Sequence, residues 1–406
     1  MEGKRIFLAS PHMSDEGYEL EYVNDAFRKN WIAPLGENVN EFEAAVKRFT
    51  GAENAVALSA GTAALHLALI LAGVGRGDKV FCQSLTFSAS ANPIAYLGAE
   101  PVFVDSESES WNLDPAAVRE AIRLHGAPKA LVAVHLYGMP AKMREIEGIC
   151  EEYGIVLVED AAEALGSVYE GRPCGTLGQL GALSFNGNKI ITTSGGGMLL
   201  CREKEDAAHA LKLATQAREP FPWYQHEEIG YNYRMSNISA GIGRGQMRVL
   251  PERIAKKREI FETYKRELAE KPLSFQEGVK DSASNRWLTA ATIADDCKVT
   301  PTELIRLLGE ENIEARHVWK PMHMQPVFSD CAFVKCGDAA VSERLFNRGI
   351  CLPSDTKMTP GEQMKVIETL KKAFYARTSR PVRGGLFLHY LIKTVCRRIL
   401  RPWSQP

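Results

Sequence analysis

The chain has 406 residues, 45% of them hydrophobic, with 49 lysines and arginines against 50 acidic residues. This length suits two packed domains, and the composition excludes a disordered chain. The near balance of charge also excludes the global positive field that nucleic-acid-binding proteins carry.

Short apolar segments alternate with helical ones over the first half of the chain. In chain order, we predict strands at 55–59, 79–82, 101–104, 130–134 and 155–158. Helical spacing of apolar residues lies between them, at 41–49, 63–71, 88–96, 116–124 and 141–153. Apolar strands that alternate with helices predict an α/β fold, in which a mostly parallel sheet is covered on both faces.

The alternation fades after about residue 200. The later segments are a long charged helix and three shorter elements, at 254–268, 289–293, 302–308 and 361–374. They indicate a second, smaller α+β unit. We therefore expect three parts: a large α/β domain over 1–245, a small C-terminal α+β domain over 246–376, and a tail over 377–406.

The tail differs from the rest of the chain in its charge. From Ser379 to Pro406 it carries six lysines and arginines and no acidic residue. On a helix its basic residues fall into adjacent rows and the rest of the surface is apolar, which is typical of a basic amphipathic helix. Attachment to an anionic membrane or to a partner is one interpretation. A helix that docks on this protein and a mobile tail are the alternatives, and the sequence leaves all three open.

Cysteine usage and the N-terminus bear on the compartment. The nine cysteines are scattered and contain no CxxC pair, and several lie in apolar runs where a thiol acts as a small hydrophobic group. Residues 1–5 lead into no long apolar stretch, so no signal peptide is expected, and no apolar run is long enough to cross a bilayer. A cytoplasmic protein is the expectation.

Polar groups gather where the predicted strands end. Gly61 and Thr62 open a helix directly after the first strand, where backbone donors and a hydroxyl suit an anion. Asp160 closes the fifth strand, and Ser184 and Lys189 follow the next apolar run. Ligands of such sheets bind beyond the carboxyl ends of the strands. Phosphate donors, a carboxylate and an amine are therefore expected around one ligand.

Pyridoxal phosphate is a cofactor that needs these three groups. Its phosphate needs donors, its ring nitrogen needs a carboxylate, and its aldehyde needs a lysine amine. Each feature alone is common, because a strand-end Asp is often a cap and most lysines are solvated. Their order and their placement at strand ends together favour the cofactor.

Five stretches in this order carry a family resemblance: Ser59–Leu65, Leu85–Asn92, Val158–Gly166, Ser184–Lys189 and Gly230–Ser236. They resemble the DegT/DnrJ/EryC1/StrS group of pyridoxal-phosphate-dependent sugar aminotransferases. The resemblance spans residues 5–376 and implies the architecture of fold-type I transferases. It also implies a homodimer with shared active sites.

The resemblance also implies the role of each site residue. Lys189 would hold the cofactor and shuttle the proton, and Asp160 would pair with the ring nitrogen. The phosphate would be bound by Thr62, Ser184 and the backbone of Gly61. Two further residues are implied at the cofactor, namely a stacking ring and a residue that reaches across the dimer interface: Phe87 and Asn232. An ordinary core Phe and an ordinary turn Asn are the competing interpretations of these two.

Two positions depart from the commonest family pattern. Glu163 stands where many members have Gln or His near the cofactor's ring oxygen, so either a raised pKa or a shifted position is expected. Asn186 stands where many members have His. Together they resemble the members that make 4-amino-4,6-dideoxy sugars, particularly the UDP-N-acetylbacillosamine pathway transaminase. Arg316 and His323, in a stretch that resembles that subgroup's sugar-nucleotide end, are further substrate-binding candidates.

The sequence therefore predicts transfer of the amino group of L-glutamate to C4 of a UDP-linked 4-keto-6-deoxy-N-acetylhexosamine, for surface glycan or glycoprotein synthesis. GDP- or dTDP-linked sugars stay open as alternatives. A sugar dehydratase of the same fold is disfavoured because Lys189 is kept, and a cofactor-binding regulatory module because the catalytic groups are kept. A nicotinamide enzyme and a metal enzyme are disfavoured, because the glycine spacing and the histidine spacing do not fit them.

Overall fold

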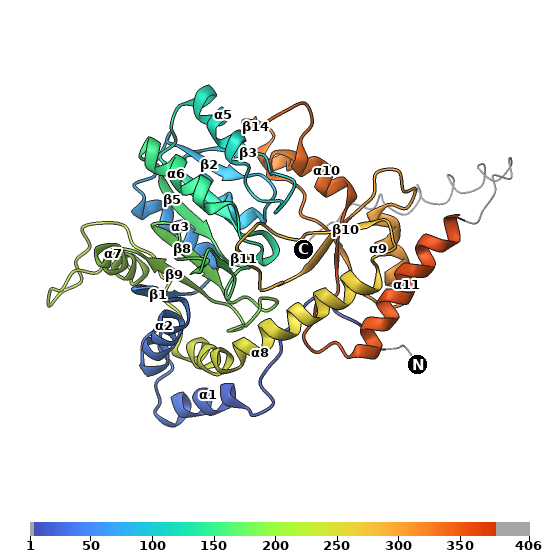
Figure 1. Cartoon of the computed structure of the whole chain (residues 1–406). Helices are drawn as coiled ribbons and strands as arrows, with labels where there is room; N and C mark the ends of the chain where they lie inside the picture. The colour runs from blue at the N-terminus through green and yellow to red at the C-terminus, as the bar shows by residue number, and fades with distance from the viewer. Residues whose placement is uncertain (1–3, 379–406) are drawn as a thin grey trace, which may run out of the picture.

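A computed structural model describes residues 4–378 of the chain (Figure 1). The amphipathic helix predicted for 379–406 lies outside the described residues. Within 4–378, no helix combines the length and the apolar character needed to cross a membrane.

An eight-stranded sheet forms the centre of the large domain (Figure 1). Across the sheet its strands are β1 (Asn54–Leu58), β9 (Gly197–Cys201), β8 (Leu180–Ser184), β5 (Val156–Asp160), β4 (Ala130–Val134), β2 (Lys79–Gln83), β3 (Glu100–Val104) and β14 (Phe333–Val334). Only β9 runs against the others, since it pairs antiparallel with both β1 and β8. The predicted mostly parallel α/β sheet is confirmed.

Helices cover both faces of this sheet because its strands are apolar on both sides. In β4, Leu131 packs into one core cluster and Val132 into the other, and both side chains are fully buried. The first cluster includes residues of α2 (Glu37–Thr50), α5 (Pro115–His125) and α6 (Met143–Tyr153). The second includes residues of α3 (Gly61–Leu71), α4 (Asn92–Tyr96) and α7 (Lys204–Ala214). The helix predicted at 88–96 is observed as two elements, a 3-10 turn, η1 (Ser88–Ser90), followed by α4.

The smaller domain is built on an antiparallel sheet with a separate core. Its strands are β10 (Leu273–Phe275), β12 (Thr289–Ile293), β15 (Gly349–Leu352) and β13 (Arg316–His317). Its helices are α9 (Pro301–Glu310), α10 (Val341–Arg348) and α11 (Pro360–Thr378). The third core cluster joins α9 and α11 to β12 and β15. A minor sheet of β11 (Ser282–Ala283), β6 (Val168–Tyr169) and β7 (Arg172–Pro173) links the two domains.

One long helix, α8 (Asn237–Glu267), runs from the large domain to the small one (Figure 1). Residue 245, where we expected the domain boundary, lies inside it. The helix also passes through Pro251, so it begins well before the charged segment that the sequence predicted at 254–268. At its N-terminal end it packs on α1 (Tyr18–Arg28), a helix that the sequence did not predict.

Candidate active site

A cavity of about 290 Å³ opens at the carboxyl ends of β1, β5 and β8, beside the loop that follows β2. Eight of the predicted site residues line it: Gly61, Thr62, Phe87, Asp160, Glu163, Ser184, Asn186 and Lys189. They come from four separate segments of the chain. Because parallel strands end at one edge of a sheet, residues far apart in sequence meet there.

The start of α3 forms one wall of this cavity. Its N-cap residue, Ala60, makes no side-chain capping hydrogen bond, so no side chain of that residue competes for the first amides of the helix. A Cβ on Gly61 would lie 2.9 Å from the Cβ of Ser184. Glycine therefore lets the helix start reach the end of β8, where the Thr62 and Ser184 hydroxyls stand beside it. A helix start with adjacent hydroxyls suits a phosphate.

The Asp160 carboxylate is held at the end of β5 by short contacts. Ser90 donates its hydroxyl to Oδ2 at 2.6 Å, and the Ala162 N–H donates to Oδ1 at 3.1 Å. Ser90 is in turn hydrogen bonded to the Thr86 hydroxyl at 2.7 Å. Asp160 is buried, yet it lines the cavity. A fixed, buried carboxylate of this kind suits a protonated ring nitrogen.

Lys189 and Glu163 form an ion pair inside the cavity. Lys189 Nζ lies 3.6 Å from Glu163 Oε1, and the two side chains are 13% and 6% exposed. The Tyr137 N–H donates to Glu163 Oε2 at 2.7 Å. Burial raises the pKa of Glu163, although Lys189 and the Tyr137 N–H both act to lower it. A raised pKa is one of the two outcomes that the sequence led us to expect here.

Aromatic side chains close the rest of the cavity. Phe87 is 54% exposed and lines the opening, and its ring lies 5.5 Å from that of Trp319. Trp287 is fully buried, and its ring lies 4.3 Å from Lys189 Nζ. An exposed aromatic face at the mouth of a polar cavity is suited to stacking on a planar ligand.

Three predicted residues do not line the cavity. Arg316, on β13, is exposed and pairs with Glu314 at 2.9 Å. His323 lies in a 3-10 turn. Its Nδ1 is 2.6 Å from the Ser84 hydroxyl, and its Nε2 is 3.2 Å from Glu343 Oε1. Asn232 is exposed and follows a segment that projects from the large domain after α7 (Figure 1). None of the three is among the residues that line the cavity around Lys189 and Glu163.

The sequence did not single out Trp287, Tyr137 or Trp319. Trp287 and Tyr137 are almost wholly buried, and a buried aromatic residue in a sequence is indistinguishable from ordinary core. One available signal for Tyr137 was its position three residues after the strand predicted at 130–134, near the strand ends where polar residues gather. The two tryptophans belong to the second half of the chain, so only the tertiary fold brings them to Lys189.

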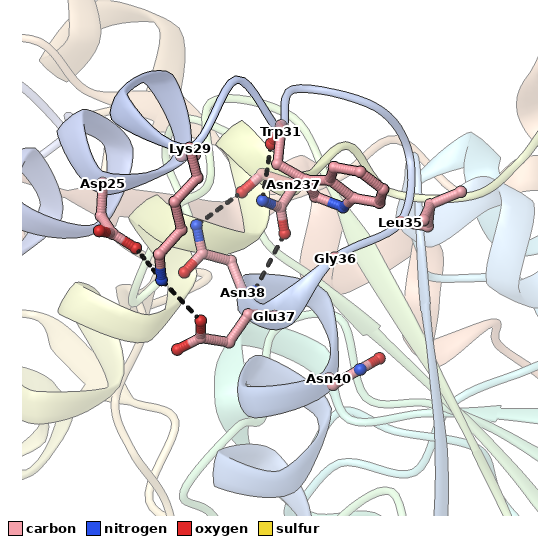
Figure 2. A pocket seen from close by; sticks show the side chains of 10 residues that line it. Asp25, Lys29, Trp31, Leu35, Gly36, Glu37, Asn38, Asn40 and Asn237 are labelled. Atoms are coloured by element: carbon pink, nitrogen blue, oxygen red, sulfur yellow. Dashed lines mark hydrogen bonds and ion pairs between the residues drawn. The ribbon is translucent and has the colours of Figure 1, made fainter.

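A larger cavity, of about 610 Å³, lies between α1, α2 and the start of α8 (Figure 2). Several of its polar groups are already paired with one another. Lys29 bridges Asp25 at 2.7 Å and Glu37 at 2.9 Å, and the Asn237 amide donates to the Trp31 carbonyl at 2.8 Å. These contacts fasten the N-terminal helices to α8. No predicted site residue lines this cavity, so its size does not make it the candidate site.

The part of the chain that the structure describes contains no cluster of three or more His, Cys, Asp or Glu side chains suited to holding a metal ion. The residues of the smaller cavity do fit pyridoxal phosphate. The uncapped start of α3, the Asp160 carboxylate and the Lys189 amine supply the three groups that this cofactor requires.

Comparison with known proteins also indicates a pyridoxal phosphate-dependent aminotransferase. The model of the DegT/DnrJ/EryC1/StrS aminotransferase family matches residues 14–371. EpsN of Bacillus subtilis, provisionally named a pyridoxal phosphate-dependent aminotransferase, is 51% identical over 378 residues, 92% of this chain and 96% of its own. A GDP-perosamine synthase of Caulobacter vibrioides is 34% identical over 368 residues, 90% of this chain and 97% of its own.

A solved structure shows the same fold. DesI, crystallised in the presence of its TDP-sugar product, superposes with a TM-score of 0.83 at 26% identity, covering 93% of this chain and 95% of its own. The chain therefore belongs to the DegT/DnrJ/EryC1/StrS aminotransferase family, and it is a pyridoxal phosphate-dependent sugar aminotransferase of fold type I.

Proposed function

We propose that the enzyme moves the amino group of L-glutamate to C4 of a UDP-linked 4-keto-6-deoxy-N-acetylhexosamine. The observation that carries the transamination is the cavity that brings Lys189, Asp160 and the uncapped start of α3 together. The choice of sugar is supported by Glu163 and Asn186. Both residues line this cavity, and together they resemble the 4-amino-4,6-dideoxy sugar subgroup.

The residues divide the work as follows. When bound, pyridoxal phosphate withdraws electrons from the reacting carbon and carries the amino group between the two substrates. Asp160 holds the proton on the ring nitrogen, which keeps that withdrawal strong. Thr62, Ser184 and the amides at the start of α3 hold the phosphate. Lys189 Nζ would hold the cofactor and, when free, would move a proton to and from the carbon that gains or loses the amino group.

We also propose a homodimer in which Asn232 of one protomer completes the cofactor site of the other. The position of Asn232 supports this, since it is exposed and lines no part of its own cavity. The projecting segment before it carries four exposed large hydrophobic residues: Phe221, Trp223, Tyr224 and Ile229. Such a patch is typical of a surface that another protein covers.

Spectroscopy of the purified protein tests the chemistry. Added pyridoxal phosphate is expected to give a visible absorption band, and L-glutamate is expected to bleach it. In Lys189→Ala the band and the turnover should both be lost, because no amine remains to bind the aldehyde. A Lys189→Ala protein that kept both would refute the assignment of Lys189.

A panel of 4-keto nucleotide sugars tests the substrate. Glutamate-dependent amination is expected with the UDP-linked N-acetylated sugar. The relatives named above include a GDP-perosamine synthase and a protein with a TDP-sugar product, so GDP- and dTDP-linked sugars belong in the panel. Reaction with those sugars alone would overturn the UDP assignment and leave the aminotransferase standing.

A further inference from the structure

Trp287 contacts Lys189 and its chain neighbour at two separate points. Its ring face lies 4.3 Å from Lys189 Nζ. Its Nε1–H donates to the carbonyl of Asn188 at 2.8 Å. One buried indole therefore touches both the reactive amine and the backbone that carries it.

Trp287 is itself fixed by Asn285, two residues before it in the chain, and by contacts from two other segments. Its backbone N–H donates to Asn285 Oδ1 at 2.8 Å, and its backbone carbonyl accepts from Lys257 Nζ at 2.9 Å. Its ring stacks on that of Tyr137, at 6.4 Å between centroids and 24° between planes. The indole is 1% exposed, so it has little room to move. It forms a rigid wall against which the longer, flexible lysine side chain rests.

Asn285 ties this wall to the loop that carries Glu163. Its amide donates to the carbonyls of Glu163 and Leu165, both at 2.9 Å. Lys189 Nζ thus lies between the Trp287 ring face and the Glu163 carboxyl, whose Oε1 is 3.6 Å away. Asn285 is hydrogen bonded to the backbone of both Trp287 and Glu163, so it orients both walls. An aromatic face attracts an ammonium group, and it does so more strongly when water is excluded.

We propose that Trp287 is a positioning residue that seats the Lys189 amine in the cavity whenever it is not bonded to the cofactor. This rests on the proposed transamination, in which Lys189 is released and recaptured in each half-reaction. A lysine amine has four rotatable bonds, so an unheld amine would spend much of its time in unproductive positions. The indole holds the amine where it takes up a proton, and the Asn188 hydrogen bond holds the backbone below it.

The test follows the recapture step directly, by stopped-flow absorbance after apoenzyme is mixed with pyridoxal phosphate. Non-covalent binding and the slower covalent step are separated by the concentration dependence of the rate. Trp287→Leu removes the ring face and the donor, and Trp287→Phe keeps a smaller ring without the donor. We expect the covalent step to slow at least about tenfold in the first and about threefold in the second, with non-covalent binding unchanged. The steady-state kcat should fall with little change in the KM for glutamate.

Trp111→Leu is the matched control, because Trp111 is a buried core tryptophan that lines no part of the cavity. It should lower the Tm like Trp287→Leu and leave the covalent step unchanged. Equal slowing in both leucine variants, or a wild-type rate in Trp287→Phe, would overturn the proposal. Should Trp287→Leu not fold, Trp287→Phe decides alone. A wild-type protein that forms no covalent bond with the cofactor would instead refute the proposed function itself.

Discussion

The single most consequential residue, Lys189, is understood through its neighbours. Sequence order was enough to pair it with Asp160, because both follow apolar strands that end at the same edge of the sheet. The contact with Trp287 was not predictable in this way. In the sequence these two residues are separated by β9, α7, the whole of α8, β10 and β11, and only the tertiary fold places the indole 4.3 Å from the amine.

Lys257, whose amine donates to the Trp287 carbonyl, should make the stability of the protein depend on pH. Lys257 is 3% exposed, and burial lowers its pKa from 10.5 to about 8, an effect that Asp355 opposes. The folded protein therefore loses this proton near pH 8, while the unfolded chain keeps it to about pH 10. Between these values the unfolded state binds more protons, so the contribution of Lys257 to stability rises with pH.

We expect the free energy of unfolding of the wild type, relative to Lys257→Met, to rise by about 2 kcal/mol between about pH 7 and about pH 10. Urea unfolding of both proteins at each pH measures this difference, and other titrating groups cancel between them. Stability differences that stay constant across this range would show that Lys257 does not titrate as its burial requires.

At the scale of elements, the buried strands were the most predictable feature. Strands apolar on both faces read as continuous apolar runs, so β4 was predicted at its observed bounds. The short strand β14 was not predicted, because two residues carry no periodic signal. Helix α1 was missed, and α8 was predicted only after Pro251. A proline normally ends a helix, and here packing on α1 and α2 sustains it.

Gly61, at the start of α3, allows a test of whether this helix start binds the cofactor phosphate. Gly61→Ala places a methyl group 2.9 Å from the Cβ of Ser184, so the helix start must shift away from β8. We expect the affinity for pyridoxal phosphate to fall at least about tenfold, or about 1.4 kcal/mol, because the amides of the helix start lose their position. Equilibrium titration of the visible band measures this loss.

Gly148→Ala is the control for that substitution. Gly148 lies in α6 with nothing within 4 Å of an added Cβ, so alanine should stabilise the helix by about 0.5–1 kcal/mol. Its cofactor affinity should match the wild type. An unchanged affinity in Gly61→Ala as well would mean that the helix start does not hold the phosphate.

At the scale of the whole molecule, the proposed dimer makes a prediction about mixed protomers. Lys189→Ala and Asn232→Ala chains should each have little activity alone. When the two are co-expressed with different tags and purified as mixed dimers, one of the two sites contains both native residues. About half of the wild-type activity per dimer should then return. If Asn232 acted within its own protomer, no site would be intact and no activity would return.

The division into a large α/β part and a smaller α+β part was predictable, and the boundary near residue 245 stays a prediction that falls inside α8. The sequence showed where strand and helix alternation fades, which places the change of architecture near α8. It carried no sign that one helix of 31 residues would serve both domains. Likewise, the sequence marked Arg316 and His323 as candidates, and only the fold shows that both are engaged with other side chains outside the cavity.

The most direct test of the central claim follows the nitrogen atom itself. The enzyme is incubated with L-glutamate labelled with ¹⁵N and a UDP-linked 4-keto-6-deoxy-N-acetylhexosamine, and the nucleotide-sugar product is analysed by mass spectrometry and NMR. We predict a product that carries ¹⁵N on C4, formed in equal amount with 2-oxoglutarate, and no product with Lys189→Ala. Consumption of the sugar without transfer of the label would contradict this prediction.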